Sequence, residues 1–224
     1  YLTQIPYPLQ MQRDNQIVSH IIGINALVWI FTLVMESQGI PLNLYGGMFY
    51  AMSPLFQPWQ PLTHMFMHGG FMHIAFNMYA LYLFGSILER VWGWRRFLFF
   101  YMSAGLGAAL IHQIATGVEA YMLFDSVYPA ENWREMYIPV VGASGAVMGV
   151  VVAFGLLFPN TRLQLLFPPI PIAAKYLVLL VIAFDAYFVI QGIDDGIAHW
   201  AHLGGAATGF LIVKMWSLNR NAFY

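Results

Sequence analysis

The 224-residue sequence contains no cysteine and very few charged residues. Without cysteine, the chain can form no disulfide, no cysteine-based metal site and no cysteine nucleophile. Charged residues make up only 8% of the chain and hydrophobic residues 60%, far outside the range of soluble globular domains. The net charge is −1, and no basic cluster is interleaved with aromatic residues. The sequence therefore indicates a polytopic membrane protein, with no nucleic acid as a partner.

Long apolar runs divide the chain. A bilayer core about 30 Å thick requires roughly 20 apolar residues per helix. Six runs meet or nearly meet that length, the fourth being the shortest: residues 17–35, 70–88, 97–117, 144–158, 172–191 and 198–218. We predict an all-α fold, one six-helix membrane domain over residues 1–224. The first run lacks signal-peptide features and is expected to remain as a span.

The basic residues predict an orientation. If alternate connections lie on opposite sides, Arg134 stands alone on one side. The other side then holds Arg13, Arg90, Arg95, Arg96, Arg162, Lys175, Lys214 and Arg220. The positive-inside rule places both termini in the cytoplasm of a multi-pass cell-membrane protein, and a bacterial inner membrane is the preferred location.

Two connections are unusual in composition. Residues 39–60 are rich in aromatic residues and methionine but broken by proline and glycine, so we expect this long first loop to lie in the membrane interface. Residues 159–175 are dense in proline, which removes backbone donors and stops helices. They are expected to form a rigid cytoplasmic connection.

Polar side chains gather at three places near the outward ends of these runs. The segment HMFMHGGFMHIAFN contains His73 and Asn77, four residues apart and therefore on one helix face. His64 and His68 precede them with the same spacing. The GASG segment places Ser144 at the start of the fourth run. Polar groups inside a membrane are costly, so each is a functional candidate.

A glycine pattern predicts that the fourth and sixth runs pack together. GASGAVMG and AHLGGAATG each hold two glycines four residues apart, a spacing that lets membrane helices bring their backbones close. Such contact would carry Ser144 and His202 into hydrogen-bond reach. A serine hydroxyl is a weak nucleophile until a base takes its proton, and an imidazole can do so near neutral pH. The free N–H groups at the start of the fourth helix, with His73 and Asn77, could stabilise an oxyanion.

These three motifs, in this order and separation, resemble the rhomboid family of intramembrane serine proteases. The resemblance implies that Ser144 is the nucleophile and His202 the general base, with His73, Asn77 and the Ser144 amide as oxyanion donors. It implies supporting roles for a further set of residues, namely His68, Gly142, Gly145, Gly205 and Gly209. Transmembrane proteins in the lipid bilayer are then the expected substrates, with no cofactor, metal or nucleotide.

The chain departs from the family pattern at one place. The family often has Trp-Arg in the first loop, whereas Trp59 is followed here by Gln60. The arginine that usually anchors the loop is therefore missing, which says nothing against the serine and histidine.

Alternatives remain open for several residues. His64 and His68 have the spacing of zinc-binding histidines, but no glutamate follows either of them, and no metal is expected. His199 lies one turn before His202 and is a rival base. Asp185, in the fifth run, suggests a serine, histidine and aspartate triad, but we interpret it as structural or water-facing. His68 is expected to support the loop through a buried hydrogen bond.

The function class also has alternatives. A catalytically silent rhomboid-like adaptor would bind transmembrane helices without cutting them, and loss of the serine or histidine would mark it. A transporter would usually show broken helices in two corresponding halves, which the sequence lacks. A hydrolase needs water below the membrane surface, so we expect an outward-open cavity lined by His64, His68, His73 and Asn77.

Overall fold

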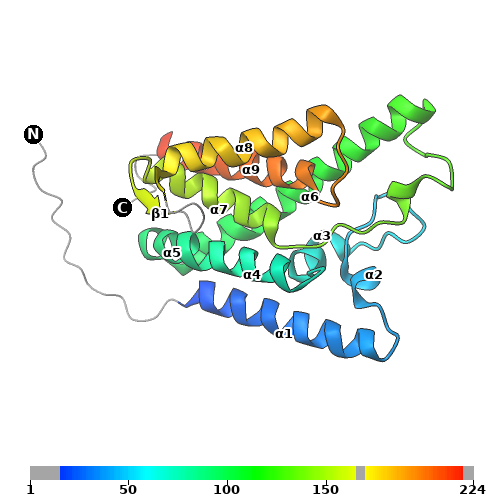
Figure 1. The fold of residues 1–224 in the computed structure, drawn as a ribbon, viewed down its shortest axis with the longest axis horizontal. Coiled ribbons are helices and arrows are strands. Elements are labelled where there is room, and N and C mark those ends of the chain that lie inside the picture. The colour runs from blue at the N-terminus through cyan, green and yellow to red at the C-terminus, as the bar shows by residue number, and fades with distance from the viewer. Residues whose placement is uncertain (1–15, 165–169, 219–224) are drawn as a thin grey trace, which may run out of the picture.

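The computed structural model describes residues 16–164 and 170–218, and these are mostly helical. Six helical segments run roughly parallel to one another (Figure 1). They are α1 (Ile17–Ser37), the segment from α4 (Phe71–Ala80) through η2 (Leu81–Gly85) to α5 (Ser86–Trp92), α6 (Trp94–Phe124), α7 (Ser144–Leu157), α8 (Ala174–Gln191) and α9 (His199–Leu218). Arg13 and Arg220, used in the orientation argument, lie outside the described residues.

Among the described residues, four segments are long and apolar enough to cross a membrane. These are Ile17–Ser37, Phe71–Trp92, Trp94–Phe124 and Ala174–Gln191. The two exceptions among the six predicted spans are α7, which has only 14 residues, and α9, whose histidines and glycines dilute its apolar character. The predicted count of six is therefore met only in part by length and composition.

The short helix α7 lies at the centre of the fold. All its residues from Gly145 to Gly155 are buried, and it packs against α6, α8 and α9. In contrast, α1 and α8 lie at opposite edges of the bundle and expose most of their apolar side chains (Figure 1). A helix that is apolar all round is stable when buried by other helices, which is the environment of α7. Its apolar character thus reflects protein packing on every side.

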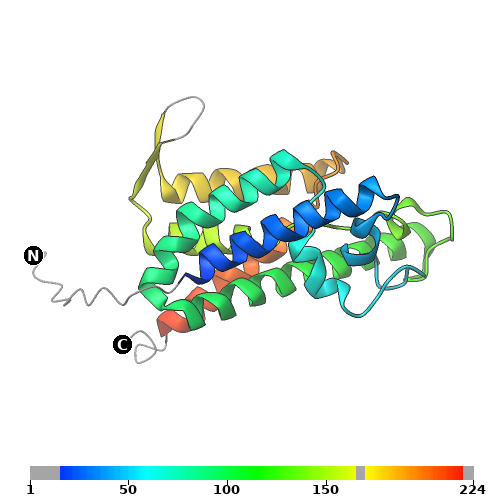
Figure 2. The ribbon, with the colours of Figure 1, turned by 90° about the horizontal axis from the view of Figure 1, so that it is seen from below.

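Apart from Arg134, the basic residues that the structure describes gather toward one end of the bundle. The α5–α6 junction, the start of β1 and the last turns of α9 lie at this end, while α2 and α3 lie at the other (Figures 1 and 2). The same end holds the start of α1, which is anchored by a buried carboxylate. Glu89 accepts hydrogen bonds from the backbone N–H groups of Ile17 at 2.8 Å and Val18 at 3.1 Å. These N–H groups have no partner within the helix, so the contact ties α5 to α1.

The connection before α8 corrects the all-α prediction in one detail. It contains a small antiparallel hairpin, β1 (Arg162–Gln164) and β2 (Pro171–Ala173), in which Leu163 pairs with Ile172. The hairpin stands away from the helices, as Figure 2 shows. The part of the proline-rich segment at residues 165–169 lies outside the described residues. This ladder of three residue pairs leaves the helical architecture unchanged.

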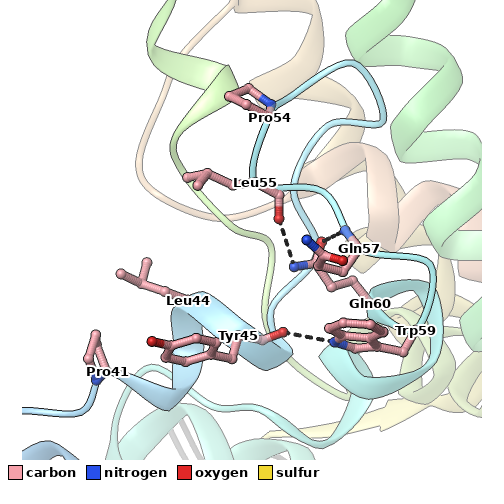
Figure 3. A pocket seen from close by; sticks show the side chains of 8 residues that line it. All are labelled: Pro41, Leu44, Tyr45, Pro54, Leu55, Gln57, Trp59 and Gln60. Atoms are coloured by element: carbon pink, nitrogen blue, oxygen red, sulfur yellow. Dashed lines mark hydrogen bonds between the residues drawn. The ribbon is translucent and has the colours of Figure 1, made fainter.

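The first loop folds around a buried glutamine at the position where the family often has arginine. Gln60 is fully buried, and its Oε1 accepts hydrogen bonds from the N–H groups of Phe49 at 3.3 Å and Gln57 at 3.0 Å. Its Nε2 donates to the Leu55 carbonyl at 3.2 Å (Figure 3). Gln60 therefore anchors the loop from within, without a charge.

A second glutamine connects the loop to α6. Gln113 accepts a hydrogen bond from the Ala51 N–H at 2.7 Å and donates to the Phe49 carbonyl at 2.8 Å. Before these anchored residues the loop forms α2 (Leu42–Gly46), and after them it leads into α3 (Gln60–Thr63) and η1 (His64–Phe66). It also encloses an apolar pocket of about 470 Å³ (Figure 3). The pocket is lined by Pro41, Leu44, Tyr45, Pro54, Leu55, Gln57, Trp59 and Gln60, none of them a predicted catalytic residue.

Candidate active site

The first loop positions the turn that precedes Ser144. Met48 and Val140 exchange two backbone hydrogen bonds of 2.8 Å, and the Gly142 N–H donates to the His64 carbonyl at 2.9 Å. Gly142 has a φ of +131°, a backbone conformation that residues other than glycine rarely adopt. α7 then starts at Ser144, so its first N–H groups lie directly behind this turn.

The space left by Gly142 is where His73 and Ser144 meet. A Cβ placed on Gly142 would lie 2.7 Å from His73 Nε2 and 3.5 Å from Ser144 Oγ. The imidazole of His73 and the hydroxyl of Ser144 therefore flank the same point. Asn77 is buried and donates one N–H to the His73 carbonyl at 3.0 Å. An amide has two N–H donors, so one of them remains for another partner.

The predicted glycine contact between α7 and α9 is confirmed. A Cβ on Gly205 would collide with the Gly145 carbonyl oxygen, and one on Gly209 would lie 2.7 Å from the Gly149 Cα. Only glycine allows backbones this close. The Ala201 carbonyl oxygen, next to His202, would lie 3.3 Å from a Cβ on Gly145. The first turn of α9 is thus placed beside the first turn of α7.

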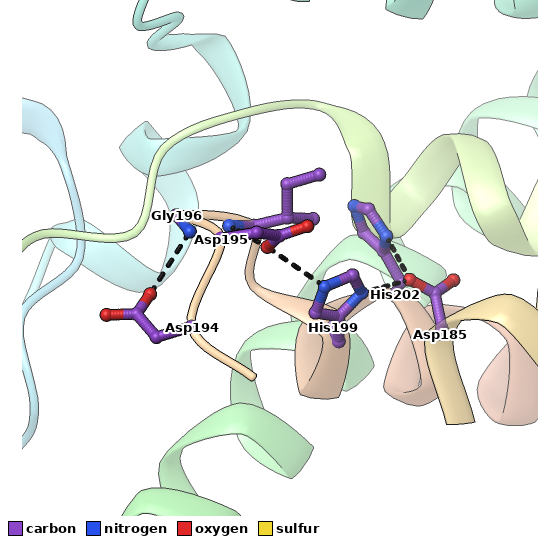
Figure 4. A network of polar contacts seen from close by, with 7 residues as sticks. Asp185, Asp194, Asp195, Gly196, His199 and His202 are labelled. Carbon is purple, nitrogen blue, oxygen red and sulfur yellow. Dashed lines mark hydrogen bonds and ion pairs between the residues drawn. The ribbon is translucent and has the colours of Figure 1, made fainter. Parts of the chain in front are cut away.

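The hydrogen bond of His202 was not foreseen from the sequence. Within the described part of the chain, no direct hydrogen bond joins Ser144 to His202. Instead, His202 Nδ1 lies 2.9 Å from Asp185 Oδ1, across the α8–α9 contact (Figure 4). Asp185 is only 2% exposed, so of its two interpretations, structural or water-facing, the second is wrong. The sequence signal was an acidic residue in an apolar run, but a span pattern cannot say which helix its side chain faces.

The rival base His199 has both ring nitrogens occupied. Its Nδ1 lies 2.6 Å from Asp185 Oδ1, and its Nε2 lies 3.1 Å from Asp195 Oδ1 (Figure 4). Neither nitrogen is free to accept a proton from Ser144. Among the residues that the structure describes, His202 has such a partner at Nδ1 only, so its Nε2 is left available as an acceptor.

His64 and His68 are more deeply buried than residues that line an open cavity would be. They are 3% and 2% exposed, and Asn77 is 6% exposed, so only His73 among the four predicted cavity residues is half-buried. The expected cavity therefore does not extend along His64, His68 and Asn77, although His73, Ser144 and His202 are only half-buried.

Burial also changes the titration of these two histidines. It is the main cause that lowers the pKa of both to about 4, and for His68 the neighbouring His73 contributes to this lowering. His64 Nδ1 lies 3.1 Å from the Gln60 carbonyl oxygen. Neither ring nitrogen of His68 has a hydrogen-bond partner among the described residues, so the expected buried hydrogen bond is absent. Its ring instead packs edge-on against His73, with 5.1 Å between ring centroids.

One group of side chains has the composition of a metal site. Asp185, His199 and His202 each offer a ligand atom, and these atoms lie within 4.8 Å of one another. Two ligands of a tetrahedral zinc, bound at about 2.0 to 2.1 Å, are separated by roughly 3.3 Å. The histidine nitrogens lie 2.6 and 2.9 Å from the carboxylate oxygen, which fits direct hydrogen bonds better than metal ligation.

Comparison with known proteins gives a consistent result. The Rhomboid domain family matches residues 55–218, which include all three motifs. The chain is 32% identical over 193 residues to Rhomboid protease AarA of Providencia stuartii, covering 82% of this chain and 64% of that protein. The chain belongs to the rhomboid family. As a rhomboid with several helices of membrane-spanning length, it is a multi-pass membrane protein.

Other relatives of this rhomboid are longer than the chain itself. It is 31% identical over 203 residues to the mitochondrial presenilin-associated rhomboid-like protein of Mus musculus, covering 89% of the chain and 48% of that protein. It is 32% identical over 152 residues to Rhomboid protease GluP of Bacillus subtilis (strain 168), covering 68% and 25%. The rhomboid described here thus spans at most 64% of the length of these three relatives.

Proposed function

We propose that this rhomboid is an intramembrane serine endopeptidase that uses Ser144 and His202 as a catalytic dyad. The observation that supports this most directly is the close contact of Gly145 with Gly205, which places the first turns of α7 and α9 side by side. Two relatives are named as rhomboid proteases, and the residue types that such a reaction needs stand at those turns. The proposal makes Ser144 the nucleophile and His202 its base.

The reaction begins when Ser144 Oγ attacks the scissile carbonyl carbon while His202 Nε2 takes the hydroxyl proton. The C–N bond then breaks, and His202 returns the proton to the leaving amine. Water attacks the acyl-enzyme with His202 again as the base, which releases the second product and restores Ser144. No cofactor or nucleotide enters these steps.

The oxyanion formed by this attack needs donors close to Ser144. The free N–H groups at the start of α7 are one source, including that of Ser144 itself. His73 Nε2 flanks the same space, and Asn77 retains one unassigned N–H. Each such donor is worth roughly 2.7 to 4 kcal/mol in comparable enzymes.

The membrane arrangement belongs to the same proposal. All six helical segments cross the bilayer, and the end that holds Arg90, Arg95, Arg96 and Lys214 faces the cytoplasm together with both termini. The first loop then lies in the opposite interface, where its exposed Tyr45, Trp59 and Leu55 side chains suit the lipid boundary. The substrates are transmembrane proteins of a cell membrane, most simply a bacterial inner membrane. A substrate helix must unwind locally, because an intact helix shields its carbonyl groups.

Reconstituted vesicles with a synthetic transmembrane substrate test the proposal. The wild-type chain should cut the substrate, and Ser144→Ala should not, because the nucleophile is lost. Ser37→Ala, at the exposed end of α1, is the matched serine control and should cut normally. Equal cleavage by wild type and Ser144→Ala would overturn the proposal, and binding without cleavage by both would favour the adaptor.

A further inference from the structure

Helix α8 buries an acidic residue while exposing its apolar ones. Only Ala174 and Asp185 are buried among its residues, although α8 is apolar enough to span a membrane. A charged residue in a span costs about 2.5 to 3.5 kcal/mol on insertion scales, so its inward position must be offset by specific partners. The partners of Asp185 are the two histidines at the start of α9 (Figure 4).

The pattern of contacts at Asp185 determines where hydrogen sits on His202. Both histidines approach Oδ1 through Nδ1, and Oδ2 has no partner among the described residues. An ionised carboxylate only accepts hydrogen bonds, so the Nδ1 of His202 must carry the hydrogen. A neutral imidazole with hydrogen on Nδ1 has its lone pair on Nε2, the atom that a base must present to Ser144.

We propose that Asp185 is a positioning residue, which holds His202 in the Nδ1–H tautomer and the ring orientation that the Ser144–His202 dyad needs. The proposal rests on the proposed function, and it adds a third residue, supplied by α8, to the pair on α7 and α9. His199 shares the carboxylate and holds it at the α8–α9 contact, with its other nitrogen on Asp195. The aspartate also stabilises the imidazolium that forms when His202 takes the serine proton.

A kinetic comparison tests this role. Asp185→Leu removes the acceptor and places an apolar side chain in the span. It also leaves His199 and His202 without this partner, so the unfolding of the variant is measured alongside its kinetics. We expect kcat to fall by about 100-fold or more with KM within about twofold, because only proton transfer is affected. Asp185→Asn keeps an acceptor oxygen and should recover part of the lost kcat. The acidic control Asp194→Asn lies in the exposed loop, paired with Arg134, and should keep the wild-type kcat.

An unchanged kcat in Asp185→Leu would overturn the proposal. Loss of cleavage in Ser144→Ala together with full activity in Asp185→Leu would leave the dyad standing and reject only the role of Asp185. Treatment with a metal chelator should leave kcat unchanged, whereas a loss that zinc restores would show that Asp185, His199 and His202 bind metal instead.

A direct measurement does not depend on whether the Asp185→Leu protein folds. In wild-type protein labelled with ¹⁵N-histidine, the ring-nitrogen shifts of His202, assigned by comparison with His202→Ala, report which nitrogen carries hydrogen. The proposal predicts hydrogen on Nδ1 and a lone pair on Nε2 near pH 7. The opposite tautomer would refute it, even if Ser144 proved essential.

Discussion

At the scale of single residues, the candidate site depends on Gly142, a residue that has no reactive group of its own. Gly142 combines a positive φ with a missing side chain, and both matter because His73 and Ser144 flank its Cα. The GASG motif could be predicted to mark the start of a helix. The exclusion of a Cβ by His73 could not, because Gly142 lies in the turn before α7, whereas His73 lies 69 positions earlier in α4.

Gly142→Ala should therefore impair both folding and cleavage. The strained φ would cost about 1 to 3 kcal/mol in unfolding free energy, and the methyl group would displace His73. We expect cleavage to fall by about tenfold or more. Gly192→Ala is the matched control, because Gly192 also has positive φ, at +61°, but has open space around it. Equal losses in cleavage for the two variants would contradict a specific role of Gly142.

Some features of the candidate site could be predicted from single residues, and others could not. Ser144 and His202 were recognisable because polar residues beside spaced glycines are rare in membrane spans. Asp185 gave an equally visible signal, but its partners depend on how α8 is rotated about its axis. That rotation follows from packing against α9, which apolar composition cannot report because most α8 side chains are exposed and apolar all round.

At the scale of elements, the contact between α7 and α9 places the two residues of the proposed dyad on adjacent helix turns. The expected helix bounds were close to those observed; for example, the sixth run was predicted at 198–218 and α9 covers His199–Leu218. The third was underestimated, because α6 continues to Phe124 and its outward end supports the first loop through Gln113. Apolar length predicts where a helix can span, but it does not predict how far a helix extends beyond the lipid.

The helix contact makes a sharp prediction for Gly205→Ala. The new methyl group would collide with the Gly145 carbonyl, and overpacking of this kind costs about 1 to 3 kcal/mol. A displacement of His202 by about 1 Å should lower kcat by about 100-fold. Gly23→Ala, in α1 with nothing within 4 Å, should be neutral in unfolding and cleavage assays. Normal activity in Gly205→Ala would show that close backbone contact is not what aligns the site.

At the scale of the whole molecule, the first loop and the helices form one enclosed unit. Gln60 replaces the expected arginine as an internal anchor, and Met48 of the loop pairs with Val140, two residues before Gly142. The sequence predicted that this loop would be unusual, but not how it folds, because its turns depend on Gln113 from a distant helix.

The enclosure predicts how stability changes with pH. The unfolded chain takes up protons on His64 and His68 as pH falls below about 6.5, but the folded chain does so only near pH 4. Stability is therefore complete above about pH 6.5 and decreases as pH falls toward 4, by about 2 kcal/mol for each histidine at about pH 5. Unfolding in detergent from pH 7.5 to 4.5 measures this slope. His68→Leu should flatten this slope, because the side chain at position 68 no longer titrates. The control His20→Gln, at an exposed position, should leave the slope unchanged. An unchanged slope in His68→Leu would contradict the account.

The pairing of Ser144 with His202 is tested most directly by covalent labelling with a serine-directed phosphonate, mapped by mass spectrometry. Wild-type protein should be labelled at Ser144, and labelling should vanish in His202→Ala. It should persist in His199→Ala, because both ring nitrogens of His199 already have carboxylate partners in the structure. Labelling that persists in His202→Ala and vanishes in His199→Ala, or that maps to another serine, would contradict the proposed dyad.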